Sequence, residues 1–389
     1  MRKLALSSLL CGLMIAGSAQ AEPDSHDTEA KLAKSLAALR ENRLDVALNE
    51  VDSLLRVNPK FKLAQLLKGD ILMARAGELN GFGNAANAPR DKIEELRTEA
   101  MVRLQRAQTQ PPVDLAPRYV WKLDPDQKYA LVVDGSRSTL YVYENVNGEP
   151  RYVTDFYITI GKLGTEKVSE GDQRTPIGVY FVTAELPKNK LADMYGSGAF
   201  PLSYPNEWDR KNGRTGSGIW LHGTPSDTYS RPPRASNGCV VLANNDLNKL
   251  AQYLQVGVTP VIITKQMGWS DEQDQADRAA LLQEIEQWRS DWASLDTNAY
   301  LKHYAGNFTS ENMDLRAWAR QKYLVNSSKT WAKINLANVS VFPYPEQPNM
   351  VVVNFEQDYS SSNLSNRMKK RQYWIKQNNR WKIVYEGAA

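Results

Sequence analysis

The sequence predicts a multidomain protein with an N-terminal α-helical segment, a central mostly-β domain and a C-terminal α+β domain. The chain has 389 residues, of which 42% are hydrophobic and 24% charged, and these values suit a globular protein of two or three domains. The hydrophobic spacing changes from a helical period to alternation after residue 112, and to a mixed pattern near residue 277. The formal charge of only +4 excludes a dominant basic field, so we expect no nucleic-acid partner.

Residues 1–21 have the features of a cleaved secretory signal peptide. Arg2-Lys3 precede an apolar run that is too short to span a bilayer, and Ala19-Gln20-Ala21 gives the small-x-small pattern that signal peptidase cleaves. Cys11 follows a leucine, which is too large for the small residue that a lipoprotein signal needs there. We therefore expect export to the periplasm without a lipid anchor. Cleavage removes two positive charges, so +4 becomes +2, and leaves Cys239 as the only thiol.

Residues 22–112 are expected to be helical. The segment from Thr28 to Ala107 is rich in Ala, Leu, Glu, Arg and Lys at helical spacing, and Asn58-Pro59 and a Gly/Asn cluster at 81–87 interrupt it. Its apolar pattern resembles about one and a half tetratricopeptide repeats; the residues concerned are Ala47, Val51, Leu54, Leu55, Pro59, Leu63, Leu67, Gly69 and Leu72. Two interpretations stay open: a peptide-binding repeat groove, or a helical hairpin used for packing or for a homodimer.

Residues 120–265 are expected to form a mostly antiparallel β domain. Strands are predicted at Leu131–Asp134, Thr139–Tyr143, Tyr152–Ile160, Gly178–Thr183, Gly218–Leu221 and Val258–Thr264, and one helix at Asp246–Leu254. The segment from Tyr195 to Asn206 is predicted to be a long loop over the site, because long ordered loops are often functional lids. Residues 266–277 are polar and acidic and predict a linker.

Residues 277–389 predict a helical start followed by strands. A helix is expected around Ala280 to Trp292, a shorter one at Asn298–Tyr304, and strands in the rest, with a turn at Asn378-Asn379. The pattern resembles the nuclear-transport-factor-2-like (SnoaL-like) cone on these residues: Trp288, Trp292, Tyr304, Phe308, Trp318, Gln357-Asp358-Tyr359, Trp374 and Trp381-Lys382-Ile383. Seven of the ten Trp follow residue 265, which favours stacked core aromatics over an aromatic pocket.

The small number of Cys and His residues limits the chemistry. Two Cys and three His are too few for zinc ribbons, iron–sulfur clusters or a disulfide scaffold. No glycine-rich phosphate loop stands between a strand and a helix, so we expect no metal and no organic cofactor. His26 lies near the new N-terminus, and His303 has no motif around it and is expected to be structural or exposed.

The remaining imidazole and thiol lie close together in the sequence, at His222 and Cys239. An imidazole within hydrogen-bond reach lowers the pKa of a thiol and so favours the attacking thiolate. Gly238 lets the backbone turn tightly before Cys239, and the same turn can leave N–H groups free to face an oxyanion. Asp246 opens an apolar helical run, and we interpret it as a helix N-terminal residue and not as a catalytic acid.

These residues resemble a known family. His222-Gly223-Thr224 followed by Ser236-Asn237-Gly238-Cys239 is similar to the signature of the L,D-transpeptidase (YkuD-like) catalytic domain, and Thr175-Pro176-Ile177-Gly178 is similar to its substrate-side turn. The resemblance spans residues 127–265. It implies Cys239 as nucleophile, His222 as general base and the Gly223 carbonyl as the group that orients the imidazole. It also implies that the amides of Gly238 and Cys239 form the oxyanion hole and that Ser236 holds the loop.

The sequence departs from the family pattern at two places. Many members have a second His after the Ser and an Arg two residues after the Cys, where this chain has Asn237 and Val241. Another residue must then bind the substrate carboxylates, and an Arg suits that task. We favour Arg234 and take Arg231 as the second choice. The expected substrate-binding residues are Arg234, Ser236, Asn237, Trp220, Tyr195 and Arg231.

The resemblance implies acyl transfer on the tetrapeptide stems of peptidoglycan, with release of D-Ala and a thioester on Cys239. A second stem would give a cross-link, as in an L,D-transpeptidase; water would give a tripeptide, as in an L,D-carboxypeptidase; a protein lysine is a third acceptor. A YkuD-like core followed by a SnoaL-like cone also resembles secreted cell-shape enzymes of Gram-negative bacteria. A non-catalytic periplasmic scaffold that binds cell-wall proteins through its helical or SnoaL-like part is the alternative from another class.

Overall fold

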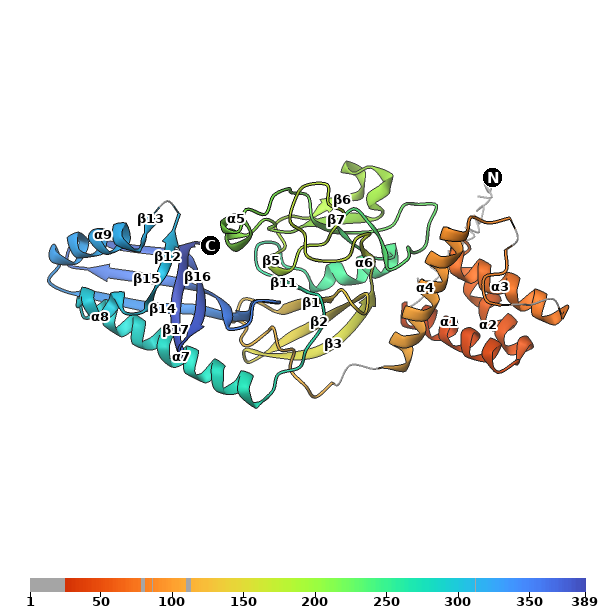
Figure 1. Cartoon of the computed structure of the whole chain (residues 1–389), viewed down its shortest axis with the longest axis horizontal. Coiled ribbons are helices and arrows are strands. Elements are labelled where there is room, and N and C mark those ends of the chain that lie inside the picture. The colour runs from red at the N-terminus through yellow and green to blue at the C-terminus, as the bar shows by residue number, and fades with distance from the viewer. Residues whose placement is uncertain (1–24, 78–80, 86, 110–112, 312) are drawn as a thin grey trace, which may run out of the picture.

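The computed structural model describes residues 25–77, 81–85, 87–109, 113–311 and 313–389, so the predicted signal peptide lies outside the described residues. Figure 1 shows three units in a row: a helical region, a central β domain and a C-terminal unit in which helices cover a sheet. Within the described residues, no helix is long and apolar enough to cross a membrane.

The helical region consists of α1 Ser25–Arg40, α2 Leu44–Val57, α3 Lys62–Arg75 and α4 Arg90–Gln108. Its apolar residues recur at helical spacing, so each helix turns one face inward, where Leu32, Val51 and Leu67 are buried. The expected helices and the interruptions between them are confirmed. Asp70 of α3 holds the segment between α3 and α4, because its carboxylate accepts hydrogen bonds from the amides of Gly83 and Asn84.

The central domain has three sheets. A five-stranded sheet has the order β3-β2-β1-β11-β5, a four-stranded sheet has the order β10-β8-β7-β6, and β4 pairs with β9. The strands are β1 Tyr129–Asp134, β2 Thr139–Val146, β3 Glu149–Tyr157, β4 Ile160–Gly161, β5 Gly178–Phe181, β6 Leu186–Pro187, β7 Gly198–Pro201, β8 Trp220–His222, β9 Arg234–Ser236, β10 Val240–Val241 and β11 Pro260–Thr264. Short helical segments are η1 Lys188–Lys190, η2 Asp193–Tyr195, α5 Glu207–Lys211, α6 Asn244–Leu250 and η3 Ala251–Tyr253. The strands and the helix expected from the sequence are all present.

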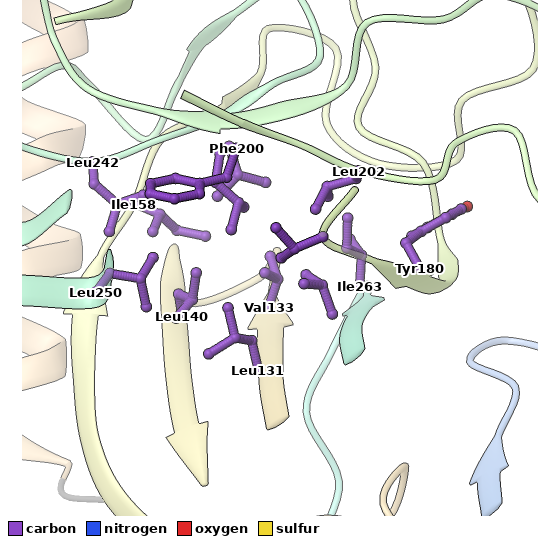
Figure 2. Packing of buried hydrophobic residues seen from close by; sticks show 14 of the residues in the cluster. Leu131, Val133, Leu140, Ile158, Tyr180, Phe200, Leu202, Leu242, Leu250 and Ile263 are labelled. Carbon is purple, nitrogen blue, oxygen red and sulfur yellow. The ribbon is translucent and has the colours of Figure 1, made fainter. Parts of the chain in front are cut away.

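A buried core joins the two larger sheets of the central domain. Leu131, Val133 and Leu140 point from the five-stranded sheet toward Phe200 and Leu202 of the other sheet (Figure 2). The interior is apolar because one face of each sheet has a full set of aliphatic and aromatic side chains. This core fixes β8, which carries His222, and β10, which directly follows Cys239.

The expectation of a long loop from Tyr195 to Asn206 is wrong. The segment contains β7, which pairs with both β6 and β8, and Phe200 is part of the core. Phe200 and Leu202 alternate with smaller residues, which is typical of a strand, but the glycines at 196 and 198 favoured a loop. The segment is therefore an element of the scaffold beside the site and not a lid.

The C-terminal unit is a cone of helices on one curved sheet. The sheet order is β13-β12-β17-β16-β15-β14. The elements are α7 Glu272–Ala293, α8 Thr297–Leu301, β12 Tyr304–Ser310, β13 Met313–Asp314, α9 Leu315–Ser327, β14 Ala332–Pro343, β15 Met350–Ser361, β16 Ser365–Gln377 and β17 Arg380–Ala388. Trp292 of α7 stacks on Tyr359 of β15, and Trp288 of α7 meets Phe355 of β15 edge-on. These aromatics are buried, which agrees with the prediction of stacked core residues.

Three expectations for this unit need correction. Helix α9 was not predicted, although Asp314 caps it by accepting a hydrogen bond from the Ala317 amide. The short helix α8 ends at Leu301, so Tyr304 begins a strand instead of ending a helix. The linker is shorter than residues 266–277, because Asp271 and Asp274 form a capping box that starts α7.

The turn predicted at Asn378-Asn379 is confirmed. Both residues have positive φ, at 48° and 59°, which is the conformation of a two-residue hairpin turn that asparagine tolerates.

Candidate active site

Cys239 lies immediately before β10, against the strand that carries His222. The two strands are parallel, with Val240 opposite Leu221 and Val241 opposite His222. The thiol of Cys239 donates a hydrogen bond to the carbonyl of Gly218 at 3.3 Å and accepts one from the amide of Trp220. The structure thus brings His222 and Cys239 to adjacent strands, although 17 residues separate them in the sequence.

The turn before Cys239 is held by three hydrogen bonds. The hydroxyl of Ser236 donates to the Cys239 carbonyl at 2.6 Å and accepts from the Gly238 amide at 3.1 Å. Thr175 donates to the Gly238 carbonyl at 2.9 Å. Gly238 has a φ of +128°, and a Cβ there would lie 2.8 Å from the carbonyl oxygen of Arg174, so only glycine fits. Ser236 therefore holds the loop, as expected.

The expected oxyanion role of the Gly238 amide does not agree with this geometry. That N–H is already bonded to Ser236, so it is not free to face a developing charge. The amide of Cys239, in contrast, has no acceptor among the residues that the structure describes. Cys239 N–H is therefore the donor available to an oxyanion, since such a donor must be unpaired before the reaction.

His222 has the environment of a neutral base. Its Nδ1 lies 2.7 Å from the carbonyl of Gly223, so Nδ1 carries the proton and donates it, and Nε2 keeps the lone pair. Burial lowers the pKa of His222 to about 4, and the charge of Arg231 acts in the same direction, while the Gly223 carbonyl opposes both. The backbone contact expected of Gly223 is present, and the imidazole is uncharged at neutral pH.

The thiol of Cys239 is also uncharged at rest. Burial raises its pKa, and the Trp220 amide and the charges of Arg231 and Lys167 only partly oppose this effect. The expectation that the neighbouring imidazole lowers the thiol pKa is therefore wrong for the free protein. The resting pair is a neutral thiol and a neutral imidazole, so the thiolate must form as the proton moves to His222.

Two arginines lie near the site, and the structure distinguishes them. Arg231 is half-buried, and its charge acts on both Cys239 and His222. Its guanidinium makes no hydrogen bond or close ion pair with another described residue, although the charge of Asp227 in the same loop acts on it. Arg234 is exposed on β9. The sequence favours Arg234, but an unpaired, partly desolvated cation beside the nucleophile suits a carboxylate better, so Arg231 is the stronger candidate.

Tyr195 and Trp220 form one wall of the site. Their rings lie 4.9 Å apart, and the Tyr195 ring meets the His222 ring edge-on at 5.2 Å. Asn244 fixes the backbone around them, because its side chain accepts from the Ser197 amide and donates to the Thr224 carbonyl. Asn237 is exposed next to the nucleophile. Both wall residues therefore lie where the sequence predicted.

Sequence reasoning missed Lys167. Its ammonium is buried, pairs with Asp172 at 2.9 Å and adds a second positive charge that favours the Cys239 thiolate. Lys167 stands in a charged stretch that is typical of a surface loop, so the sequence does not indicate its role beside Cys239. Thr175, in contrast, stood in the motif at 175–178, and its role is to hold the nucleophile turn.

His303 and Asp246 lie outside the active site and have structural roles. His303 is buried between Glu284 and Asp291 of α7, with its ring nitrogens 2.7 and 2.8 Å from the two carboxylates. Asp246 lies in the first turn of α6, as expected of a helix N-terminal residue. Within the described part of the chain, no group of three or more His, Cys, Asp or Glu side chains could hold a metal ion.

Family models match the central domain and the C-terminal unit. The family model of the L,D-transpeptidase (YkuD) catalytic domain matches residues 128–263. The model of the Cds6 C-terminal NTF2-like domain matches residues 280–387. Among curated proteins, no significant match was found.

Two solved structures resemble the chain over most of their own lengths. Bd1075 of Bdellovibrio bacteriovorus is 28% identical with a TM-score of 0.62, over 71% of this chain and 98% of its own. The helical cell shape determining protein Pgp2 of Campylobacter jejuni is 27% identical with a TM-score of 0.59, over 75% of this chain and 98% of its own. Both structures therefore align with most of this chain and with nearly all of their own residues.

Proposed function

We propose that the protein is a cysteine acyltransferase acting on peptidoglycan stem tetrapeptides. Residues 128–263 match the family model of the L,D-transpeptidase catalytic domain and residues 280–387 that of an NTF2-like domain, which supports this proposal. The observation that carries the proposal is the juxtaposition of Cys239 with a neutral, singly hydrogen-bonded His222 on adjacent parallel strands. A thiol and an imidazole so arranged are the components of nucleophilic acyl transfer.

In the first step, the Sγ proton of Cys239 moves to Nε2 of His222 while Sγ attacks the carbonyl carbon between the third and fourth stem residues. The oxyanion accepts a hydrogen bond from the Cys239 amide. The C–N bond then breaks, the leaving D-Ala nitrogen takes the proton from His222, and a thioester remains. No carboxylate is needed to orient His222, because the Gly223 carbonyl already fixes the ring and its tautomer.

The substrate's carboxylates need a cationic partner, and Arg231 supplies one. Its guanidinium is half-buried and unpaired among the described residues, and its charge acts on the Cys239 thiol. A planar guanidinium can hold a carboxylate by two parallel hydrogen bonds. The Tyr195 and Trp220 rings would cover the apolar part of the stem on the other side.

The acyl acceptor decides between two activities. Transpeptidation by a second stem's amine is the activity of the matched domain family, and we propose it as the class. Hydrolysis to a tripeptide, an L,D-carboxypeptidase activity, is the second candidate. The likeness to Pgp2, a helical cell shape determining protein that matches over 98% of its own length, supports a role in cell shape under either activity. In either case we propose a role in cell-wall remodelling and cell shape.

We also propose that the protein works in the periplasm, after removal of residues 1–21. The signal-like sequence supports this location, and so does the substrate. Binding of cell-wall proteins by the flanking regions, a tetratricopeptide character of the helices and a homodimer stay predictions.

The test is incubation of the purified mature protein with tetrapeptide muropeptides, followed by separation and mass measurement of the products. Cross-linked dimers support transpeptidation, and tripeptides support carboxypeptidation. The Cys239→Ala variant should leave the tetrapeptide intact. Equal product profiles for wild-type and Cys239→Ala proteins would leave only the scaffold interpretation.

A further inference from the structure

The loop from Pro225 to Pro233, which carries Arg231, lies against the helical region. Lys60, between α2 and α3, donates from its ammonium to the Ser226 carbonyl at 2.8 Å. The Tyr229 amide donates to the Lys60 carbonyl at 3.4 Å. We call residues 225–233 the arginine loop. These two hydrogen bonds join the arginine loop to the turn between α2 and α3.

Tyr229 belongs to the core of the helical region and not to that of the central domain. Its ring packs on Phe61 with the centroids 4.7 Å apart, and it contacts the buried cluster of helices α1 to α4. Thr28 of α1 is hydrogen-bonded to its hydroxyl. The inner surface of the helices, where a repeat groove would take a foreign peptide, thus holds a side chain of the chain's own loop.

Ser230 ties the loop to a buried ionic group. Its hydroxyl donates to Glu99 of α4 at 2.7 Å, and Glu99 pairs with Arg103 at 3.0 Å. Arg103 also pairs with Glu29, and its guanidinium lies 3.7 Å from the centroid of the Tyr157 ring of β3. Glu99 and Arg103 are both almost fully buried, and buried charges hold position well only when every partner is present.

The next residue in the chain is Arg231, and the central domain holds its backbone. Tyr157 and Thr159 donate from their hydroxyls to the Arg231 carbonyl at 3.0 and 3.1 Å. Thr159 also exchanges two backbone hydrogen bonds with Val241, two residues after Cys239. The backbone of Arg231 is thus held between the helical anchor at Ser230 and the segment that pairs with β10, the strand directly after Cys239.

From these contacts we infer that the helical region is a clamp on the arginine loop, and that Tyr229 and Ser230 are positioning residues that set Arg231 beside Cys239. The inference deepens the proposed function and rests on it for the substrate. It assigns the helices a task in the catalytic unit, which favours the packing interpretation of the helical hairpin over the peptide groove. Figure 1 shows the helical region seated beside β3, as this task requires.

The test combines kinetics on a tetrapeptide with the pH profile of Cys239 alkylation by iodoacetamide. Tyr229→Ala should lower kcat/KM by about ten-fold, mainly through KM, because Arg231 is no longer held at the substrate. It should also raise the pH midpoint of alkylation, because the thiolate loses a neighbouring positive charge. Tyr229→Phe keeps the ring on Phe61 and should behave almost as wild type.

A double-mutant cycle separates positioning from general destabilisation. In an Arg231→Ala background, Tyr229→Ala should have almost no further effect on either readout, because its action passes through the arginine. Lys68→Ala is the matched control: it breaks a surface ion pair with Asp52 inside the helical region and should change neither. If Tyr229→Ala does not fold, Ser230→Ala takes its place.

Additive effects of Tyr229→Ala and Arg231→Ala, or an alkylation profile that Tyr229→Ala leaves unchanged, would overturn the clamp. These outcomes are distinct from failure of the proposed function. If wild-type protein does not process tetrapeptides, the substrate proposal fails, but the alkylation measurements still test whether the helices set Arg231 beside Cys239.

Discussion

Two histidines of the chain are equally well buried, with 3% of His222 and 5% of His303 exposed, but their partners differ. His222 in the central domain has one backbone carbonyl on Nδ1. His303 in the cone has a carboxylate on each ring nitrogen. Burial alone therefore does not make a catalytic base. What matters is that one nitrogen of His222 keeps a lone pair, whereas both nitrogens of His303 are bound to acids and tie α7 to the sheet.

The largest effect is expected at the catalytic pair. His222→Gln should reduce kcat for tetrapeptide processing by about 10⁴-fold or more, because no other group can take the thiol proton. Cys239→Ala should abolish thioester formation. Steady-state assays with thermal melts check this, and near-normal turnover of His222→Gln would refute the assignment of the base.

A smaller effect is expected at the arginines. Arg231→Ala should lower kcat/KM by about 10- to 100-fold through loss of a charge-assisted contact with the substrate carboxylate. Arg234→Ala, exposed on β9, is the matched control and should change it by less than about two-fold. A larger loss of kcat/KM in Arg234→Ala than in Arg231→Ala would favour Arg234 as the carboxylate ligand, as the sequence does.

The pH dependence sharpens the contrast between the histidines. The pKa of His222 is lowered to about 4, so kcat/KM should rise as that proton leaves, with an acid limb near pH 4 instead of near the usual pKa of a histidine. Removing Arg231 takes a positive charge away from the imidazole, so Arg231→Ala should move this limb upward. A limb that stays in place in Arg231→Ala would show that the arginine charge does not reach His222.

The smallest effect on catalysis is expected at His303. His303→Gln cannot satisfy both Glu284 and Asp291, so the protein should lose about 1–3 kcal/mol of unfolding free energy while kcat stays within about two-fold of wild type. Denaturant titration and the tetrapeptide assay measure the two quantities. A large fall in kcat without loss of stability would give the cone histidine a catalytic role.

The sequence was informative where chemistry depends on residue type and spacing. Only one thiol and one motif-bearing imidazole remained after the signal peptide was set aside, so His222 and Cys239 could be predicted. The Asn378-Asn379 turn and the strands of the central domain followed from local patterns. The L,D-transpeptidase and NTF2-like domains followed from the resemblance and agree with the matched family models.

The remaining features depend on contacts between distant segments. The engagement of the Gly238 amide by Ser236 depends on the rotamer of one hydroxyl. The preference for Arg231 depends on its partial burial and on its charge reaching Cys239, which proximity in sequence does not encode. The raised pKa of Cys239 likewise reflects its packing. Helix α9 was missed because its strand-like aromatic residues outweighed its Asp314 cap.

Capture of the acyl-enzyme is the strongest test of Cys239 as the nucleophile. Mature protein is mixed with a tetrapeptide muropeptide, quenched in acid within seconds, and its intact mass is measured before peptide mapping. We expect an added mass equal to the muropeptide less D-Ala, located on Cys239 and absent from Cys239→Ala. Product formation by wild-type protein with the adduct on another residue, or by Cys239→Ala, would contradict it.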